Sequence, residues 1–399
     1  MMEDEAAVGA GPPDGYRSNS RRRGVRGKQN PGLQGQASWV SCVINLVNTI
    51  VSAGVLAMPL AISHMGIVLG IFVILWSGVM AGFGLYLQSL CAQYLDRGNT
   101  SFFALSQITY PNAAVVFDGA IAIKLIIIPL SYLHRLDSLK YTSIAALVSM
   151  GYLVVLVVYH FIIGDTKTDR GLICVIHWAG AVPTLSSFPV IVFAFTCHQN
   201  MFSILNEIQN NSHFRTTAVM LASIRSSATT YILVAITGYL SFGNSVGGNI
   251  IGMYPPGVWA MIGRAAIVIL VMFSYPLQCH PCRASIDASY IVAMTVSSLE
   301  AVLAYVGSTG STSISFILPG IFYYKISAPD SPTHQRLMKE DDEAEDAYIS
   351  GASDVEDGGG QARPLSENLL RKLSLALAVY GVIVMITCLV MNSVFLASS

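Results

Sequence analysis

Charged side chains are scarce in this sequence: Asp, Glu, Lys and Arg make up 11% of its 399 residues, whereas soluble proteins carry about 25%. The charges are also unevenly distributed, since residues 1–38 hold ten of the 45 and residues 327–372 hold sixteen. So little charge elsewhere cannot keep a globular surface in water, which excludes a soluble enzyme, a nucleic-acid-binding protein and a disordered scaffold. The hydrophobic content of 53% and the mean hydropathy of +0.58 indicate a polytopic protein of the lipid bilayer.

Signals of secretion, disulfide bonding and catalysis are missing as well. The first apolar run begins only at Trp39, after a polar stretch rich in Gly, Ser and Arg, so no cleavable signal peptide is expected. The seven cysteines are an odd number and lie mostly in apolar runs, which argues against a disulfide framework. No nucleophile–base pair and no HExxH-type metal motif stands out. We therefore expect no catalytic residues, no bound metal, no cofactor and no enzymatic activity.

Long uncharged stretches predict an all-α membrane protein of about ten transmembrane helices, because strand-like alternation is absent. Residues 39–95 contain no charged side chain, and a break at 63–66 divides them into two lengths near the ~20 residues that a membrane crossing requires. Further spans are expected at 113–134, 141–164 and 186–206. Pro255 and Pro256 divide 226–282 into two more spans. The last three are 288–307, the part of 301–324 that follows residue 307, and 373–399.

The two charged segments set the predicted domain boundaries. A disordered cytosolic tail (1–38) precedes a transmembrane core (39–326), and a disordered acidic cytosolic loop (327–372) separates this core from a last transmembrane helix (373–399). Segments of high charge and low hydrophobicity cannot bury enough apolar surface to fold alone, so both are expected to stay solvated.

Basic residues in short loops predict the orientation, because such residues remain on the cytosolic side. The Arg and Lys cluster at 21–28 places the N-terminal tail in the cytosol. If ten spans then alternate, nearly all later short basic loops fall on the opposite side, and one additional crossing between 111 and 134 would restore them. The apolar run 125–134 has only ten residues, enough for about half a crossing. The conflict indicates that parts of two helices are missing, unless a dominant first helix sets the orientation and 113–134 is one ordinary span.

The first span contains a run of small residues, Ser52, Ala53 and Gly54, in the middle of the expected helix. Small residues in mid-membrane let a helix unwind, which frees N–H groups and a positive half-helix end to hold a carboxylate. Asn48 and Thr49 lie about one turn away. The alternative is that the small residues form a packing face against a neighbouring helix, which is common in membranes.

A second unusual run lies within 193–201. Thr196, Cys197, His198, Gln199 and Asn200 are five consecutive polar or polarisable residues in an otherwise apolar stretch. They cannot all face lipid at low cost, so they are expected to line a cavity or to meet an unwound partner. A single histidine is more often satisfied by packing, but this one stands beside two amides. Two interrupted helices in separate halves of a chain are the sequence signature of inverted-repeat transporters.

The segments 48–59, 193–207 and 307–320 resemble the amino acid/auxin permease family. More narrowly, the chain is similar to fungal vacuolar amino acid transporters of the AVT type and to the sodium-coupled neutral amino acid transporters. The resemblance covers about 38–394. It implies a leucine-transporter-type fold, in which two inverted five-helix repeats are followed by an eleventh helix and the substrate is held between helices one and six.

The resemblance also implies which residues bind ligands. The amides of the unwound part of helix one would meet the substrate carboxylate, and the interrupted part of helix six would meet the amine. In the sodium-coupled relatives, a helix-one asparagine and a helix-eight hydroxyl hold the cation. The expected substrate-binding residues are Ser52, Ala53, Gly54, Val55, Thr196, Cys197, His198 and Gln199, and the expected cation-binding residues are Asn48 and Ser274. A proton would need no such set of oxygen ligands. The resemblance thus leaves two coupling ions open, a proton and sodium.

The chain departs from the family pattern in two places. The end of helix three and the start of helix four are missing between Lys124 and Leu125, and the loop and first part of helix nine are missing between Asp287 and Ala288. The expected function is secondary active transport of an amino acid substrate across an internal, vacuolar membrane by alternating access. Two alternatives are a transporter-like amino acid sensor, suggested by the long tail and the acidic loop, and a truncated form that does not transport.

Overall fold

The structure is a computed structural model, and it describes residues 37–51, 53–95, 100–109, 136–166, 170–176, 180–209, 212–282, 304–339 and 367–398. Residues 1–36 of the predicted N-terminal tail, residues 340–366 of the predicted acidic loop, Ser52 and the two predicted junctions at 124/125 and 287/288 lie outside these ranges. They therefore stay predictions.

The described part of the chain is almost entirely helical, which confirms the expected fold class at this level. Its one β contact is an isolated bridge between Ala37 and Ile208. The helices are α1 (Trp39–Ile50), α2 (Met58–Met65), α3 (Ile67–Cys91), α4 (Phe102–Thr109), α7 (Leu136–Ile163), α8 (Ala181–Ala194), α9 (His198–Glu207), α10 (His213–Phe242), α11 (Ile250–Met253), α12 (Val258–Cys282), α15 (Leu318–Ile326) and α17 (Glu367–Ser398). The shorter elements are the 3₁₀ helices η1 (Ala53–Ala57), η2 (Ala92–Tyr94) and η5 (Gly243–Ser245), and the π-helical segments η6 (Gly307–Ser311) and η7 (Ser313–Ile317).

Five described helical stretches are long and apolar enough to cross a membrane, and α1 with α2 make a sixth if this bent pair counts as one span. The five are Ile67–Tyr94, Ser143–Ile163, Ala181–Glu207, His213–Ser245 and Glu367–Val394. Large apolar side chains such as Phe72, Trp76 and Val79 of α3 point out of the bundle. A bundle surrounded by lipid is expected to expose such side chains, because the bilayer core is itself apolar.

Several helices begin earlier than the spans expected from the sequence. α10 starts at His213 instead of 226, α8 at Ala181 instead of 186, and α17 at Glu367 instead of 373. The expected boundaries followed the charged and proline residues, but a helix continues past the apolar layer as long as its backbone is hydrogen-bonded. Ser212, for example, caps α10 by accepting a 3.2 Å hydrogen bond from the amide of Arg215.

The expected division at Pro255 was also placed too late. α10 already ends at Phe242, and Gly243 follows with a φ of 58°. This left-handed conformation favours glycine, because it has no Cβ atom to clash with the backbone. A Cβ at this position would also overlap the carbonyl oxygen of Gly171. The chain therefore turns at Gly243, while Pro255 lies in the short connection between α11 and α12.

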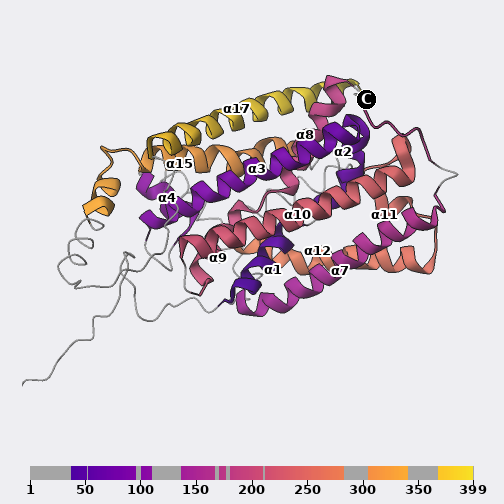
Figure 1. Cartoon of the computed structure of the whole chain (residues 1–399), viewed down its shortest axis with the longest axis horizontal. Helices are drawn as coiled ribbons and strands as arrows, with labels where there is room; N and C mark the ends of the chain where they lie inside the picture. The colour runs from indigo at the N-terminus through magenta and orange to yellow at the C-terminus, as the bar shows by residue number, and fades with distance from the viewer. Residues whose placement is uncertain are drawn as a thin grey trace, which may run out of the picture.

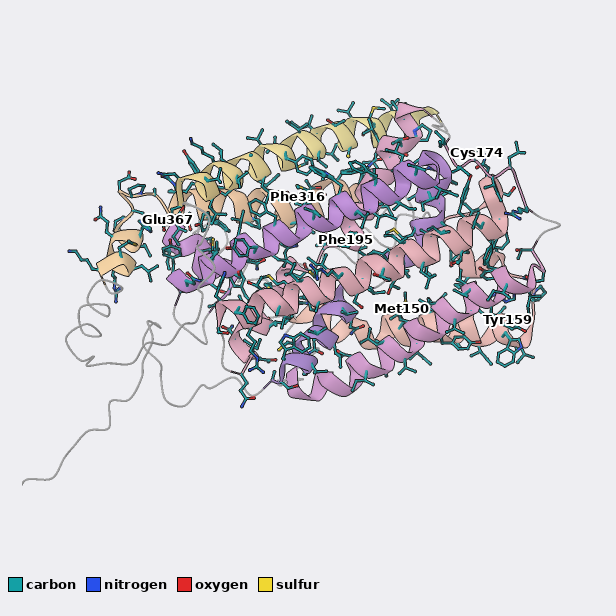
Figure 2. The ribbon with its side chains drawn as sticks, in the orientation of Figure 1. Met150, Tyr159, Cys174, Phe195, Phe316 and Glu367 are labelled. Carbon is teal, nitrogen blue, oxygen red and sulfur yellow. The ribbon has the colours of Figure 1, made fainter. Side chains whose placement is uncertain are left out.

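The helices form an elongated bundle with the two helix breaks inside it. Figure 1 shows α15 and α17 along one side and α7 and α12 along the other, with the long helices α3 and α10 between them. Phe195, at the end of α8, lies in the middle of the bundle, whereas Glu367 marks one end of it (Figure 2). Residues at the two breaks, among them Val55, Phe195 and Cys197, are buried within the bundle.

Candidate functional site

The first interrupted helix breaks where the sequence is richest in small residues. α1 ends at Ile50, the backbone of Val51 leaves the helical region (φ −81°, ψ 79°), and the chain continues through η1 into α2. The two halves are bent by 49°. Pro59 lies in the first turn of α2, where its missing N–H costs no helical hydrogen bond. Small residues before a proline thus allow the expected break.

The second interrupted helix breaks inside the polar run. α8 ends at Ala194, Phe195 and Cys197 have non-helical backbone angles, and α9 begins at His198. The hydroxyl of Thr196 donates a 3.0 Å hydrogen bond back to the carbonyl of Val192. A side chain bonded to the preceding turn competes with the helical backbone, which favours an interruption at this point.

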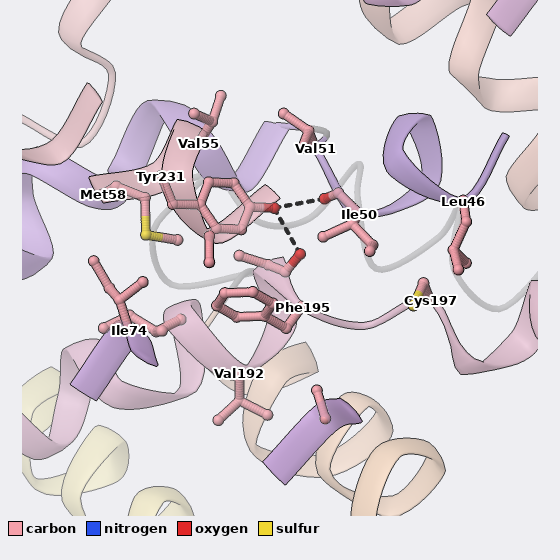
Figure 3. Close-up of a cluster of buried hydrophobic side chains, with 14 of the residues drawn as sticks. Leu46, Ile50, Val51, Val55, Met58, Ile74, Val192, Phe195, Cys197 and Tyr231 are labelled. Carbon is pink, nitrogen blue, oxygen red and sulfur yellow. Dashed lines mark hydrogen bonds between the residues drawn. The ribbon is translucent and has the colours of Figure 1, made fainter. Parts of the chain in front are cut away.

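The two breaks lie directly against each other. A Cβ atom added to Gly54 in η1 would lie 2.9 Å from the Cβ atom of Ala194, the last residue of α8. Only glycine therefore fits between these backbones without a displacement. The hydroxyl of Tyr231 in α10 donates to the carbonyl oxygens of Ile50 and Ala194 at 2.6 and 2.7 Å (Figure 3).

Polar contacts also connect the half-helices on each side of the breaks. On one side, the side-chain amide of Asn200 in α9 donates a 3.0 Å hydrogen bond to the hydroxyl of Thr49 in α1. On the other side, His64 of α2 and Ser187 of α8 are hydrogen-bonded at 2.7 Å. The first half of one interrupted helix therefore pairs with the second half of the other. This antiparallel pairing is what two inverted repeats would produce.

Positive and negative ends of helix dipoles both lie at the breaks. The carbonyl groups that end α1 and α8 carry the negative ends of two helix dipoles, and the amides that begin α2 and α9 carry the positive ends. An amide without a partner can hold a carboxylate, and a carbonyl has two lone pairs, so it can accept from an ammonium group as well as from another donor. The arrangement suits a small zwitterion, because both of its charged groups would find backbone partners.

The structure brings most of the expected substrate residues to the two breaks. Gly54 and Val55 are buried in η1, Ala53 begins η1, and Thr196 and Cys197 lie between α8 and α9. Gln199 follows in the first turn of α9, and its Oε1 atom is buried with no hydrogen-bond partner among the described residues.

His198 faces a different neighbour from the one expected. Its Nε2 atom lies 3.1 Å from the carbonyl oxygen of Ala81 in α3, and its own carbonyl accepts a 2.8 Å hydrogen bond from Gln88. The ring is fully buried against α3. In this conformation His198 anchors the second break to α3, so its contact with a substrate stays a prediction.

The expected cation residues lie on helices that contact each other. Asn48 is fully buried in the last turn of α1, and α1 contacts α12, the helix that carries Ser274. The structure describes Ser274 as part of α12 but does not describe its side chain. The cation site therefore also stays a prediction.

Sequence reasoning missed two groups at the breaks. Tyr231 gave no signal, because a single tyrosine in an apolar span looks like any lipid-facing or core residue. Ser315 of η7 lies with its hydroxyl 3.5 Å from that of Thr196. The run rich in Ser and Thr at 308–315 could have indicated Ser315. This run lies in the π-helical segments η6 and η7, and π-helical segments often occur at functional sites.

The sequence matches a known family of membrane proteins over most of its length. Residues 35–127, 120–291 and 288–341 match the family described as transmembrane amino acid transporter protein. The chain belongs to this family. The family resemblance expected from the motifs at both breaks is thereby confirmed.

Vacuolar amino acid transporters of fungi align with nearly the whole chain. It is 39% identical to vacuolar amino acid transporter 5 of Schizosaccharomyces pombe, over 90% of this chain and 95% of that protein. It is 32% identical to vacuolar amino acid transporter 6 of Saccharomyces cerevisiae, over 88% of this chain and 98% of that protein. Sodium-coupled neutral amino acid transporter 4 of Homo sapiens is 25% identical over 36% of this chain and 31% of its own length.

The alignments also show that the relatives have residues that this chain does not. The alignment with the S. pombe protein is 430 positions long but includes 90% of the 399 residues, about 359, so about 70 positions are occupied in the relative alone. The three matches to the transmembrane amino acid transporter family meet at 120–127 and 288–291. These are the places next to which the sequence predicts two missing segments.

Proposed function

We propose that this protein transports amino acids across an internal, vacuolar membrane by alternating access, with the substrate held between the two helix breaks. The observation that carries the proposal is that the two breaks lie side by side, with Gly54 packed on Ala194, so that backbone groups of both can reach one substrate next to this contact. Family membership supports it, because the fungal relatives are named as vacuolar amino acid transporters. The antiparallel pairing of the half-helices supports a leucine-transporter-type inverted-repeat fold.

In this proposal, the backbone does most of the recognition. The amides of Ser52, Ala53, Gly54 and Val55 bind the substrate carboxylate, and Thr196, Cys197, His198 and Gln199 surround the amine. Every amino acid has both groups, so the site is expected to accept several substrates. The side chain of the substrate then decides only how well each one packs.

A proton or sodium gradient drives the transport in this proposal. If the ion is sodium, the amide oxygen of Asn48 and the hydroxyl of Ser274 supply oxygen ligands together with freed carbonyls. Oxygen ligands of this kind suit sodium and would not be needed for a proton. An Asn48→Leu variant would thus lose sodium-driven transport and would keep proton-driven transport.

The test is uptake of labelled amino acids by liposomes that contain the purified protein, with a pH gradient or a sodium gradient imposed. The proposal predicts saturable uptake that depends on one of the two gradients. Liposomes without protein are the control. Saturable binding with no uptake under either gradient would contradict transport and would favour the alternative, an amino acid sensor.

A second candidate function is a truncated form that binds amino acids without transporting them. It is favoured by the roughly 70 positions that the S. pombe relative has and this chain lacks. Inserting the relative's segments after Lys124 and after Asp287 would restore the missing parts. If this candidate is correct, the restored chain transports and the original chain does not. Equal uptake by both chains would exclude it.

A further inference from the structure

The hydroxyl of Tyr231 contacts both interrupted helices. It donates to the carbonyl of Ile50, the last residue of α1, and to that of Ala194, the last residue of α8 (Figure 3). The side chain is fully buried. Its ring packs edge to face against Phe195, with 5.1 Å between the ring centroids. Both the ring and the hydroxyl are therefore held at the second break.

The two acceptors are the carbonyls of the last residues of α1 and α8. The last carbonyls of a helix have no partner within it, and they carry the negative end of the helix dipole. Away from water, each of them needs a donor from another part of the protein. Tyr231 supplies that donor from α10, a helix that is itself unbroken from His213 to Phe242.

We propose that Tyr231 is the positioning residue that holds the two helix breaks against each other. The role rests on the proposed function, since the breaks are the substrate site of that proposal. A phenol has one O–H, so it cannot fully satisfy two carbonyl oxygens at once. The hydroxyl therefore shares its proton between the breaks. This shared bond holds the last carbonyl of α1 beside the last carbonyl of α8.

The test varies the number of hydrogen-bond donors on the side chain at position 231. Phenylalanine keeps the ring and offers no donor, tyrosine offers one, and 4-aminophenylalanine offers two N–H groups. Exchange of backbone hydrogen for deuterium reports how often each segment opens. We expect exchange in η1 and in 196–200 to be fastest with Tyr231→Phe, intermediate in the unmodified protein and slowest with 4-aminophenylalanine. Loss of one buried hydrogen bond corresponds to an increase of roughly tenfold.

The matched control is Tyr239→Phe on the same helix. Tyr239 is also fully buried, and its hydroxyl donates to Asn244 and accepts from the amide of Cys174, both at 2.9 Å. Removing this hydroxyl costs hydrogen bonds away from the breaks, so exchange in η1 and in 196–200 should not change. A response to Tyr231→Phe at only one break, or an equal response to Tyr239→Phe, would overturn the proposal.

Transport supplies a second readout that a purely structural tyrosine would not affect. Misaligned breaks must be reordered each time the substrate binds, so Tyr231→Phe should raise KM by roughly tenfold and change the maximal rate much less. If Tyr231→Phe does not fold, 4-aminophenylalanine still tests the role, because exchange equal to that of the unmodified protein would overturn it. Exchange is measured without transport, so an inactive chain leaves that result interpretable.

Discussion

Replacing Gly54 with valine is expected to reduce amino acid uptake strongly. A Cβ atom at this position would lie 2.9 Å from the Cβ and 3.2 Å from the Cα of Ala194, and valine adds two further methyl groups. The two breaks would have to move apart, at a cost of about 1–3 kcal/mol for an overpacked contact. That cost falls on the substrate site itself, so uptake should decrease by roughly tenfold or more. Liposome uptake at a fixed protein amount measures the effect.

The control for this variant is Gly151→Val in α7, because a Cβ atom at Gly151 has no atom within 4 Å. Both variants make the same chemical change in a membrane helix, but only one places it between the breaks. Uptake by Gly151→Val should equal that of the unmodified protein. A Gly54→Val protein that transports normally would contradict the contact between the breaks.

The second large effect is expected for Gly84→Val, this time on folding. A Cβ atom at Gly84 in α3 would overlap the carbonyl oxygen of Ser315 and would lie 2.8 Å from the Nε2 atom of His198. Backbone oxygen cannot move away as a flexible side chain can, so α3 and η7 must separate. Overpacking of this kind should lower the thermal unfolding midpoint by roughly 5 °C or more.

Gly310→Val is the matched control for folding, since Gly310 lies in η6 and a Cβ atom there meets nothing within 4 Å. Its unfolding midpoint should stay close to that of the unmodified protein. Equal midpoints for Gly84→Val and the unmodified protein would show that α3 and η7 do not pack as closely as the structure has them.

The positions of both breaks could be predicted because their causes are local. Small residues around Gly54, Pro59 five residues later and the polar run that begins at Thr196 all disfavour a continuous helix in the neighbourhood where they occur. Local composition also gave the mostly helical fold class. These features need no knowledge of what lies across the bundle.

The partners of the breaks could not be predicted, because they come from residues distant in the sequence. Tyr231 lies 181 residues from Ile50 in the chain, and nothing in its neighbourhood indicates that it would bond to that carbonyl. The side that His198 faces depends on how α3 packs. Helix starts such as His213 were missed for another reason, since charge marks the edge of the apolar layer and not the end of a helix.

The central claim is that an amino acid binds between the two breaks, and substrate-dependent hydrogen exchange tests it most directly. The purified, unmodified protein would be labelled with deuterium in the presence of each amino acid of the uptake panel and without any. The account predicts that every transported amino acid slows exchange in both η1 and 196–200, while the others leave both unchanged. A transported amino acid that protects neither break, or only one of them, would contradict it.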